Sequence, residues 1–181
     1  MPLLKKKVYT TEDIYALPDG QRAELIDGQM YLMAPPKTIH QRLVSKLGQK
    51  IANYIDNNGG NCEVFPAPFA VFLYGDDKNY VEPDLSIICD KSKIDDRGCN
   101  GAPDWIIEIV SPSNAYMDYN IKLFKYRTAG VREYWIVNPM KRTVMVFDFA
   151  YEKNSNQYNF EDDISSCIYG NLTINLAAML P

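Results

Sequence analysis

Hydrophobic positions between residues 38 and 56 recur every three or four residues, which is the spacing of one buried face of a helix. The apolar members of this face are Leu43, Val44, Leu47, Ile51, Tyr54 and Ile55. Thr38 and Gln41 have the spacing of a capping box at its start. The run Asn57-Asn58-Gly59-Gly60 supplies residues that tolerate a positive φ and is predicted to end the helix.

A β-hairpin is predicted around Asp27-Gly28. Short strand-like runs, residues 22–26 and 29–33, flank this dipeptide, and Asp-Gly between two such runs is typical of a two-residue hairpin turn. Upstream, Thr10 and Asp13 again have the spacing of a capping box, so a short helix is predicted there. Pro18-Asp19-Gly20 breaks it.

Strand-like apolar runs dominate the middle of the chain. They cover residues 62–73, 80–89 and 104–110, and the segments between them, 75–79 and 90–103, are interpreted as a turn and a charged loop. The third run is apolar apart from Asp104 and Glu108, which is typical of a central strand covered on both faces.

A second amphipathic helix is predicted from about Ala115 to Ala129, where Gly130 stops it. Its buried face is expected to consist of Met117, Ile121, Phe124 and Thr128, with Asp118, Lys122 and Lys125 on a neighbouring stripe. Strands at 133–137 and 143–149 follow, and residues 151–181 are weakly patterned, with two short strands and a terminal turn expected.

The element order predicts an α/β fold, a mixed central β-sheet flanked by helices. A chain of 181 residues with 46% apolar content fits one domain, with the motif-bearing core at about 10–149 and residues 150–181 packed on it as an extension. No apolar run approaches the ~20 residues of a membrane span, so no membrane partner is expected. The four cysteines (Cys62, Cys89, Cys99 and Cys167) lack Cys-x-x-Cys spacing and are interpreted as reduced thiols of a cytoplasmic protein.

Two carboxylates lie inside strongly apolar runs, Asp84 after Pro83 and Glu108 in the next run. Buried charge is costly unless a cation meets it, and both Lys122 and a divalent metal would do so. Mg²⁺ can be held by two carboxylates and a backbone carbonyl, here that of Ile109, together with water. Such a site suits phosphodiester hydrolysis, in which the metal helps to generate hydroxide and a lysine orients the water or offsets charge. Taken singly, each acid is equally well explained as a charge at a strand end or on a solvated face.

Other chemistries have less support. There is no nucleophile elbow, phosphate-binding glycine loop or dinucleotide fingerprint. His40 is the single histidine; nothing in its spacing supports a serine or cysteine hydrolase, and we interpret it as a surface or site-rim residue. A glycosidase-like carboxylate pair would leave the lysine unexplained. The net charge of −4 gives no overall attraction to nucleic acid.

Five segments occur in a recognisable order. They are Arg22-Ala23-Glu24-Leu25-Ile26-Asp27-Gly28, Pro83-Asp84-Leu85, Glu108-Ile109-Val110-Ser111-Pro112-Ser113, residues 118–126 with Lys122, and Gly130-Val131-Arg132-Glu133-Tyr134-Trp135. Over roughly Thr10 to Phe149 the chain therefore resembles the Uma family of restriction endonuclease-like proteins, a branch of the PD-(D/E)xK nuclease superfamily.

The resemblance implies a restriction-endonuclease-like core and cleavage of DNA that depends on Mg²⁺, with Mn²⁺ as a substitute. Asp84 and Glu108 match the metal-binding acids of the superfamily. The usual lysine would stand two residues after the glutamate, where this chain has Val110. Lys122 matches the lysine that this family is taken to carry on the next helix.

The resemblance extends to residues around these ligands. Glu24 matches the extra acid of such cores and is expected to ligate the metal or to hold its water. Tyr126 would lie at the same site, although packing as a helix aromatic explains it about equally well. His40 and Asp118 are candidates for residues that contact the metal ligands without binding the metal themselves. Asn138, where the family often has aspartate, is interpreted as structural.

Two hypotheses follow. The first is a Mg²⁺-dependent endonuclease acting on DNA, and analogy with the superfamily makes a homodimer the expected assembly. The second is a binding module for nucleic acid or protein that has the nuclease fold without the chemistry. The complete set of Asp84, Glu108 and Lys122 favours the first hypothesis, and the net acidity of the chain favours the second.

Overall fold

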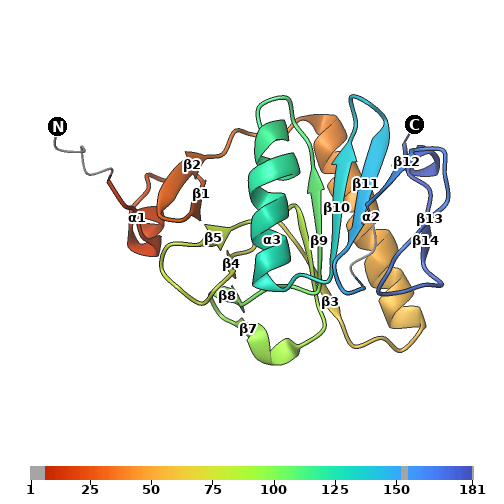
Figure 1. Cartoon of the computed structure of the whole chain (residues 1–181), viewed down its shortest axis with the longest axis horizontal. Helices are drawn as coiled ribbons and strands as arrows, with labels where there is room; N and C mark the ends of the chain where they lie inside the picture. Colours follow the sequence, from red (N-terminus) through yellow and green to blue (C-terminus); the bar gives the residue numbers. More distant parts are fainter. Residues whose placement is uncertain (1–6, 152–154, 181) are drawn as a thin grey trace.

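The computed structural model describes residues 7–151 and 155–180. Its described part contains two six-stranded sheets and one two-stranded sheet (Figure 1). The strand order is β12-β11-β10-β9-β6-β3 in the larger mixed sheet and β2-β1-β5-β4-β8-β7 in the sheet beside it. The predicted mixed α/β architecture is therefore confirmed.

Strand β9 (Trp105–Ile109) lies in the middle of the larger sheet and is entirely buried. It runs parallel to β10 (Glu133–Asn138) and antiparallel to β6 (Leu85–Ile88). Beyond these three, the sheet is completed by β11 (Thr143–Asp148), β12 (Asn156–Asn159) and β3 (Glu63–Pro66). Because β9 and β10 are parallel, their carboxyl ends meet at one edge of the sheet, where β6 begins.

Helices cover the two faces of this sheet (Figure 1). On one face, α2 (Thr38–Asn57) buries its predicted apolar stripe in a cluster that includes Trp105 and Trp135. On the other face lie a π-helical segment, η2 (Met117–Lys122), and its continuation α3 (Leu123–Ala129), with Tyr126 in a second cluster. Burying one large apolar side chain stabilises the fold by about 1.5–3 kcal/mol. The many buried side chains of these two clusters therefore supply much of the hydrophobic stabilisation.

The smaller sheet begins with the predicted hairpin, β1 (Ala23–Ile26) and β2 (Gln29–Leu32). Asp27 and Gly28 both have positive φ, 51° and 71°, as a two-residue turn of this kind requires. The other strands are β5 (Tyr80–Val81), β4 (Val71–Phe72), β8 (Gly98–Asn100) and β7 (Ile94–Asp95). The preceding helix α1 (Thr11–Tyr15) has the predicted capping box between Thr10 and Asp13.

Residues 155–180 pack against the larger sheet and α2. Besides β12 they form β13 (Ile164–Ser165), β14 (Thr173–Ile174) and a short 3₁₀ turn, η3 (Ala177–Met179). Their buried side chains Phe160, Ile164, Leu172, Ile174 and Leu176 belong to the same cluster as the apolar face of α2. The end of the chain therefore completes the core on that side.

Four boundaries were predicted wrongly. The run at 62–73 is divided between β3 of the larger sheet and β4 of the smaller one. The run at 80–89 is not one strand: β5 and β6 belong to different sheets, because Pro83 between them has no N–H to donate to a ladder. Asp84 consequently lies directly before β6 and not within a strand. Residues 90–103 contain a 3₁₀ turn, η1 (Lys91–Lys93), and the pair β7–β8. Helix α2 has Lys37 as its N-cap, so Thr38 is its first helical residue and not its cap.

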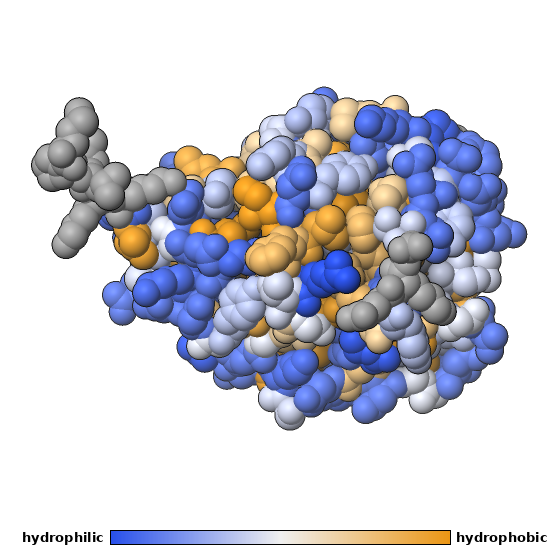
Figure 2. All heavy atoms as spheres, in the orientation of Figure 1, coloured by the Kyte–Doolittle hydropathy of each residue, from blue (hydrophilic) through white to orange (hydrophobic). Residues whose placement is uncertain are grey.

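The buried face of the helix after β9 was also predicted wrongly. Asp118, Lys122 and Tyr126 are buried, whereas Phe124 is 64% exposed. Figure 2 shows apolar surface gathered around this helix. Charged side chains are stable on the inner face because partners on other elements meet them, which helical periodicity cannot reveal.

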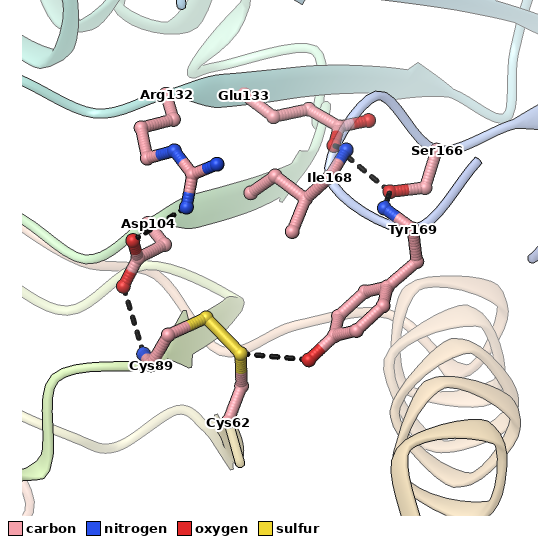
Figure 3. The surroundings of a disulfide bond; sticks show 8 residues. All are labelled: Cys62, Cys89, Asp104, Arg132, Glu133, Ser166, Ile168 and Tyr169. Atoms are coloured by element: carbon pink, nitrogen blue, oxygen red, sulfur yellow. Dashed lines mark hydrogen bonds and ion pairs between the residues drawn. A yellow bond between two sulfur atoms is a disulfide. The ribbon is translucent and has the colours of Figure 1, made fainter. Parts of the chain in front are cut away.

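The expectation of four reduced thiols is corrected as well. Cys62 and Cys89, 27 residues apart, form a disulfide beside the edge pair β3–β6 (Figure 3). Cys99 and Cys167 are free. Disulfides are rare in reducing compartments, so the thiol argument for a cytoplasmic location no longer holds.

Candidate active site

A cleft of about 500 Å³ lies at the end of the larger sheet at which the central strands β9 and β10 finish and β6 begins. Its walls come from residues 33–37 before α2, residues 110–114 after β9 and the turn at 139–140. Asp84, Glu108, Asp118 and Lys122 all line it. The cleft therefore gathers the acids and the lysine that the sequence predicted to act together.

Lys122 is the centre of this polar cluster. Its Nζ donates to Glu24 Oε1 and to Glu108 Oε1, each at 2.9 Å, and lies 3.9 Å from Asp118 Oδ1. The side chain is only 6% exposed. The π-helical turn η2 and the first turn of α3 hold the lysine under the sheet, so three carboxylates from three elements converge on one ammonium group.

These carboxylates keep the lysine charged. Burial alone would lower the pKa of Lys122, but the charges of Glu108, Glu24 and Asp118 outweigh burial and raise this pKa well above its usual value. The ammonium group is therefore protonated throughout the neutral range. It can donate hydrogen bonds and neutralise negative charge, but it cannot accept a proton.

Glu108 contacts the lysine and, like it, lines the cleft. Its Oε1 accepts from Tyr126 Oη at 2.6 Å as well as from Lys122, and its Oε2 accepts from the backbone N–H of Asp84 at 3.3 Å. Burial raises the pKa of Glu108 to about 8; Lys122 opposes that rise, and the charge of Asp84 adds to it. Burial likewise raises the pKa of Asp118 to about 7.

Asp84 is held from two sides. Its Oδ2 accepts from the backbone N–H of Ile109 at 2.7 Å and lies 3.0 Å from His40 Nε2. Asp84 thus accepts from the N–H of Ile109, next to Glu108, and Glu108 accepts from the N–H of Asp84. These two hydrogen bonds fix the spacing of the two carboxylates. The Nδ1 atom of His40 is buried without a hydrogen-bond partner among the described residues.

The structure adds a pair that sequence reasoning missed. Glu82 lies two residues before Asp84, is 7% exposed and lines the cleft. It pairs with Arg22, accepts from Tyr80 Oη at 2.6 Å, and its N–H donates to Glu24 Oε1 at 3.0 Å. Its position in the same apolar run as Asp84 was the available signal.

The remaining predicted residues divide between site and framework. Tyr126 contacts Glu108 directly, so its place at the site is more than packing. Asn138 caps the turn after β10, accepting from the N–H groups of Met140 and Lys141 at 3.1 and 3.0 Å, in agreement with a structural role. Asp118 lies 3.9 Å from Lys122 and His40 lies 3.0 Å from Asp84, and both also line the cleft.

The residues present suit a hard cation only in part. The described residues include no group of three or more His, Cys, Asp and Glu side chains arranged to hold a metal ion. Asp84 and Glu108 nevertheless offer oxygen donors on a cleft, and Mg²⁺ usually keeps several waters and needs one or two carboxylates. Burial is the main cause of the raised pKa of Glu108, and the repulsion from Asp84 that adds to it is the kind of interaction that a divalent cation relieves. Two carboxylates of the kind that Mg²⁺ uses are therefore present, and water would have to fill the other coordination positions.

Comparison with known proteins finds similarity to a family, to a curated protein and to a solved structure. The Uma2 family model, described as "Putative restriction endonuclease", matches residues 11–177. The chain is 27% identical over 106 residues to the uncharacterized protein slr1290 of Synechocystis sp., a match that covers 59% of this chain and 54% of that protein. The chain thus spans about half the length of this curated relative.

A solved structure has the same fold. It is a putative nuclease belonging to DUF820 from Anabaena variabilis, with a TM-score of 0.75 at 18% identity, and the superposition covers 94% of this chain and 96% of that one. Separately, no helix in the described part of the chain has the length and apolarity needed to cross a membrane.

Proposed function

This chain belongs to the Uma2 family, and from that premise and the cleft geometry we propose that it is an endonuclease that hydrolyses phosphodiester bonds of DNA with Mg²⁺. One observation carries the proposal: Lys122, buried among acids, places its ammonium group 2.9 Å from Glu108, which is interlocked with Asp84 at the cleft. Structural ion pairs need no such opening to solvent. An acid–acid–lysine set facing a cleft offers metal ligands and a cation, which metal-assisted phosphodiester hydrolysis can use.

Asp84 and Glu108, together with the backbone carbonyl of Ile109, would hold the metal. When bound, Mg²⁺ supplies Lewis-acid polarisation of the phosphate and a more acidic water. The chain's own residues prepare these ligands: the N–H of Ile109 and His40 fix Asp84, and Tyr126 fixes Glu108. Mn²⁺ has the same ligand preference and is expected to substitute.

Lys122 acts as a cation in this proposal. Its charge offsets the negative charge that develops on the attacked phosphate, and its N–H groups orient the attacking water. Glu24 and Asp118 hold the ammonium group in place and keep it protonated. We assign Glu24 primarily to this positioning, because its Oε1 is already shared by Lys122 and the N–H of Glu82.

Incubation of the purified protein with supercoiled plasmid DNA tests the proposal. Nicking or linearisation is expected with Mg²⁺ and not with EDTA. Asp84→Asn and Lys122→Met are expected to abolish it while the circular dichroism spectrum keeps its shape. Glu12→Gln, an exposed carboxylate on α1, is the matched control and should cleave as the parent does. Equal cleavage by all variants would assign the activity to a contaminant and overturn the proposal.

A silent binding module is the second candidate, and one observation favours it. The three acids around Lys122 occupy the lysine in the arrangement described, so a role confined to holding η2 against the sheet is sufficient to explain it. The two candidates differ in metal binding. A nuclease site should raise the melting temperature with Mg²⁺ or Mn²⁺ in a way that depends on Asp84, and a silent module should not.

Two further expectations complete the proposal. A homodimer would bring two clefts to the two strands of a duplex, and sedimentation or light scattering of the purified protein checks the assembly. The expected cytoplasmic location has lost its thiol argument because of the Cys62–Cys89 disulfide, and localisation of a tagged chain in cells checks it.

A further inference from the structure

The exposed side of α2 carries a basic stripe. Arg42, Lys46 and Lys50 follow one another at intervals of four residues, and all three are exposed. Four residues turn a helix by about 40°, so the three side chains form one slightly slanted row roughly 12 Å long. The helix contains one acid, Asp56, more than a turn beyond Lys50. These three cations are called the α2 stripe.

Neither the core nor the ion-pair network accounts for the α2 stripe. The core uses the opposite side of the helix, residues such as Leu43, Leu47 and Ile51. Some exposed cations elsewhere are paired, as Lys91 is with Glu63 and Arg97 with Asp95, and others, such as Lys78, have no ion pair in the described part of the chain either but stand singly. Among the described residues, no acid lies within ion-pair distance of the α2 stripe. Like charges four residues apart weaken a helix by about 0.2–0.5 kcal/mol per pair, so the row is unfavourable on its own.

The α2 stripe joins two concave parts of the surface. At the start of the helix, Lys37, His40 and Gln41 line the candidate active cleft, and Arg42 is the next residue. Toward the other end, Lys46, Lys50 and Asn53 line a hollow of about 620 Å³. The C-terminal residues 171–173 form the opposite side of that hollow, so an extended ligand leaving the cleft along α2 would enter it.

Charge complementarity identifies the ligand as a polyanion. The chain as a whole has a net charge of −4, so the α2 stripe is a local concentration of positive charge and not the consequence of a basic protein. A basic stripe along one helix, next to a cleft suited to phosphodiester chemistry, is the electrostatic footprint of a nucleic-acid contact. Flexible lysine and arginine side chains spaced along a row suit successive phosphates of one strand.

We propose that the α2 stripe binds the phosphate backbone of a DNA strand that extends from the active cleft toward the hollow between α2 and residues 171–173. The choice of DNA as ligand rests on the proposed function. The binding itself needs neither metal nor cleavage, because the contacts go to phosphates and not to the scissile bond. The α2 stripe thus sets affinity and direction of the strand, and the cleft does the chemistry.

Equilibrium binding tests this assignment. The fluorescence anisotropy of a labelled DNA duplex of about 30 base pairs would be followed in EDTA over a series of salt concentrations. The test protein is the triple variant Arg42→Gln, Lys46→Gln, Lys50→Gln. The matched control is the triple variant Lys78→Gln, Arg97→Gln, Arg127→Gln, which removes the same charge from exposed positions on the smaller sheet and α3.

If the α2 stripe contacts phosphates, its removal should lower affinity at least tenfold, an order-of-magnitude estimate at ~0.1 M salt. The slope of log K against log salt should fall by about two to three, because each phosphate contact contributes about 0.7–0.9. The control should keep the parent slope. Equal losses in both triple variants, or no binding by the parent, would overturn the assignment.

The outcome is separable from that of the proposed function. DNA binding through the α2 stripe without any Mg²⁺-dependent cleavage would support the proposed phosphate contact and contradict the proposed nuclease activity. If the α2 triple variant cleaves DNA and binds it with unchanged affinity and salt dependence, the result would support the nuclease activity and contradict the phosphate contact of the α2 stripe. Asp84→Asn, which should not cleave, is expected to bind with the parent salt slope.

Discussion

Two buried glutamates on neighbouring strands of the same sheet have opposite surroundings. Glu133, on β10, is fully buried and accepts four hydrogen bonds, from Trp135 Nε1 and from Ser166 Oγ, Cys167 N and Ile168 N. No lysine or arginine pairs with it among the described residues. Glu108, on β9, has a lysine and a tyrosine as partners and further carboxylates close by.

The two acids also lie toward opposite ends of these parallel strands. Glu133 is paired in register with Trp105 at the start of β9, and Glu108 with Ile136, three residues further along β10. The end with Glu133 is closed by the C-terminal segment and adjoins the Cys62–Cys89 disulfide (Figure 3). The end with Glu108 opens to the cleft.

The difference shows that burial of an acid does not by itself indicate function. Fixed neutral donors saturate Glu133, so its carboxylate ties a distant segment to the sheet and has no spare acceptor capacity toward solvent. Glu108 belongs to a set with unbalanced charge that a cation from solution would stabilise. The number of donors and the access to solvent separate the structural acid from the candidate catalytic one.

The largest expected difference concerns activity. Glu108→Gln should reduce Mg²⁺-dependent cleavage of DNA by at least a factor on the order of 10²–10³, because it removes a metal ligand and a partner of Lys122. Glu133→Gln should leave the rate per folded molecule unchanged. Rates from a gel-based plasmid assay, normalised to the folded fraction, check this. Similar losses in both variants would mean that the two acids do not differ in function.

Stability should show the reverse order. Glu133→Ala leaves buried donors without an acceptor and is expected to lower the free energy of unfolding by roughly 3–5 kcal/mol. Glu108→Gln weakens the ion pair with Lys122 but keeps an oxygen acceptor for Lys122 and Tyr126, relieves repulsion with Asp84, and should therefore change this free energy by less than about 1 kcal/mol. Urea denaturation followed by tryptophan fluorescence measures both. A larger loss in Glu108→Gln would contradict the assignment of roles.

Removal of the disulfide should affect only the end of the larger sheet that contains Glu133. The double variant Cys62→Ser, Cys89→Ser opens a loop of 27 residues and is expected to lose about 3 kcal/mol of stability. The active cleft lies at the other end of the sheet, so cleavage by the folded fraction should persist. Cys99→Ser is the control for a buried thiol. Loss of cleavage in a fully folded double variant would show that the two ends are coupled.

The smallest expected effect is a pH dependence. Glu108 and Asp118 have raised pKa values, about 8 and about 7, so the folded state retains their protons where the unfolded chain has released them. The stabilisation of the folded state by these two protons is complete below the pKa values of the unfolded chain. It is lost as pH rises through the pKa values of the folded state. Without metal, stability should therefore fall by roughly 1–3 kcal/mol between about pH 5 and about pH 8.

Thermal unfolding in EDTA across this pH range measures the loss. Asp118→Asn removes one of the two groups and should flatten the profile, whereas Asp56→Asn, an exposed acid on α2, should not. Mg²⁺ at about pH 8 should restore stability to the parent and not to Asp84→Asn. A parent profile that rises over this range would show that neither proton is retained on folding.

Local patterns were sufficient for the elements whose stability is local. The hairpin at Asp27-Gly28, the extent of α2 and the buried strand β9 all follow from turn chemistry and periodicity within a few residues. The acids Asp84 and Glu108 were also evident, because a carboxylate in an apolar run is unusual wherever it is placed. The sequence by itself thus determined the layers of the fold and the reactive residue types.

Only the tertiary structure decided how these parts meet. Lys122 is buried because Glu24, 98 residues away, and Glu108 hold it, so the helix turns inward a stripe that periodicity placed beside the apolar face. Glu133 is structural because donors 33–35 residues downstream reach it, and Cys62 finds Cys89 through the pairing of β3 with β6. These contacts depend on sheet register and chain reversal, which no local window encodes, since their energy appears only once the distant partners have been brought together.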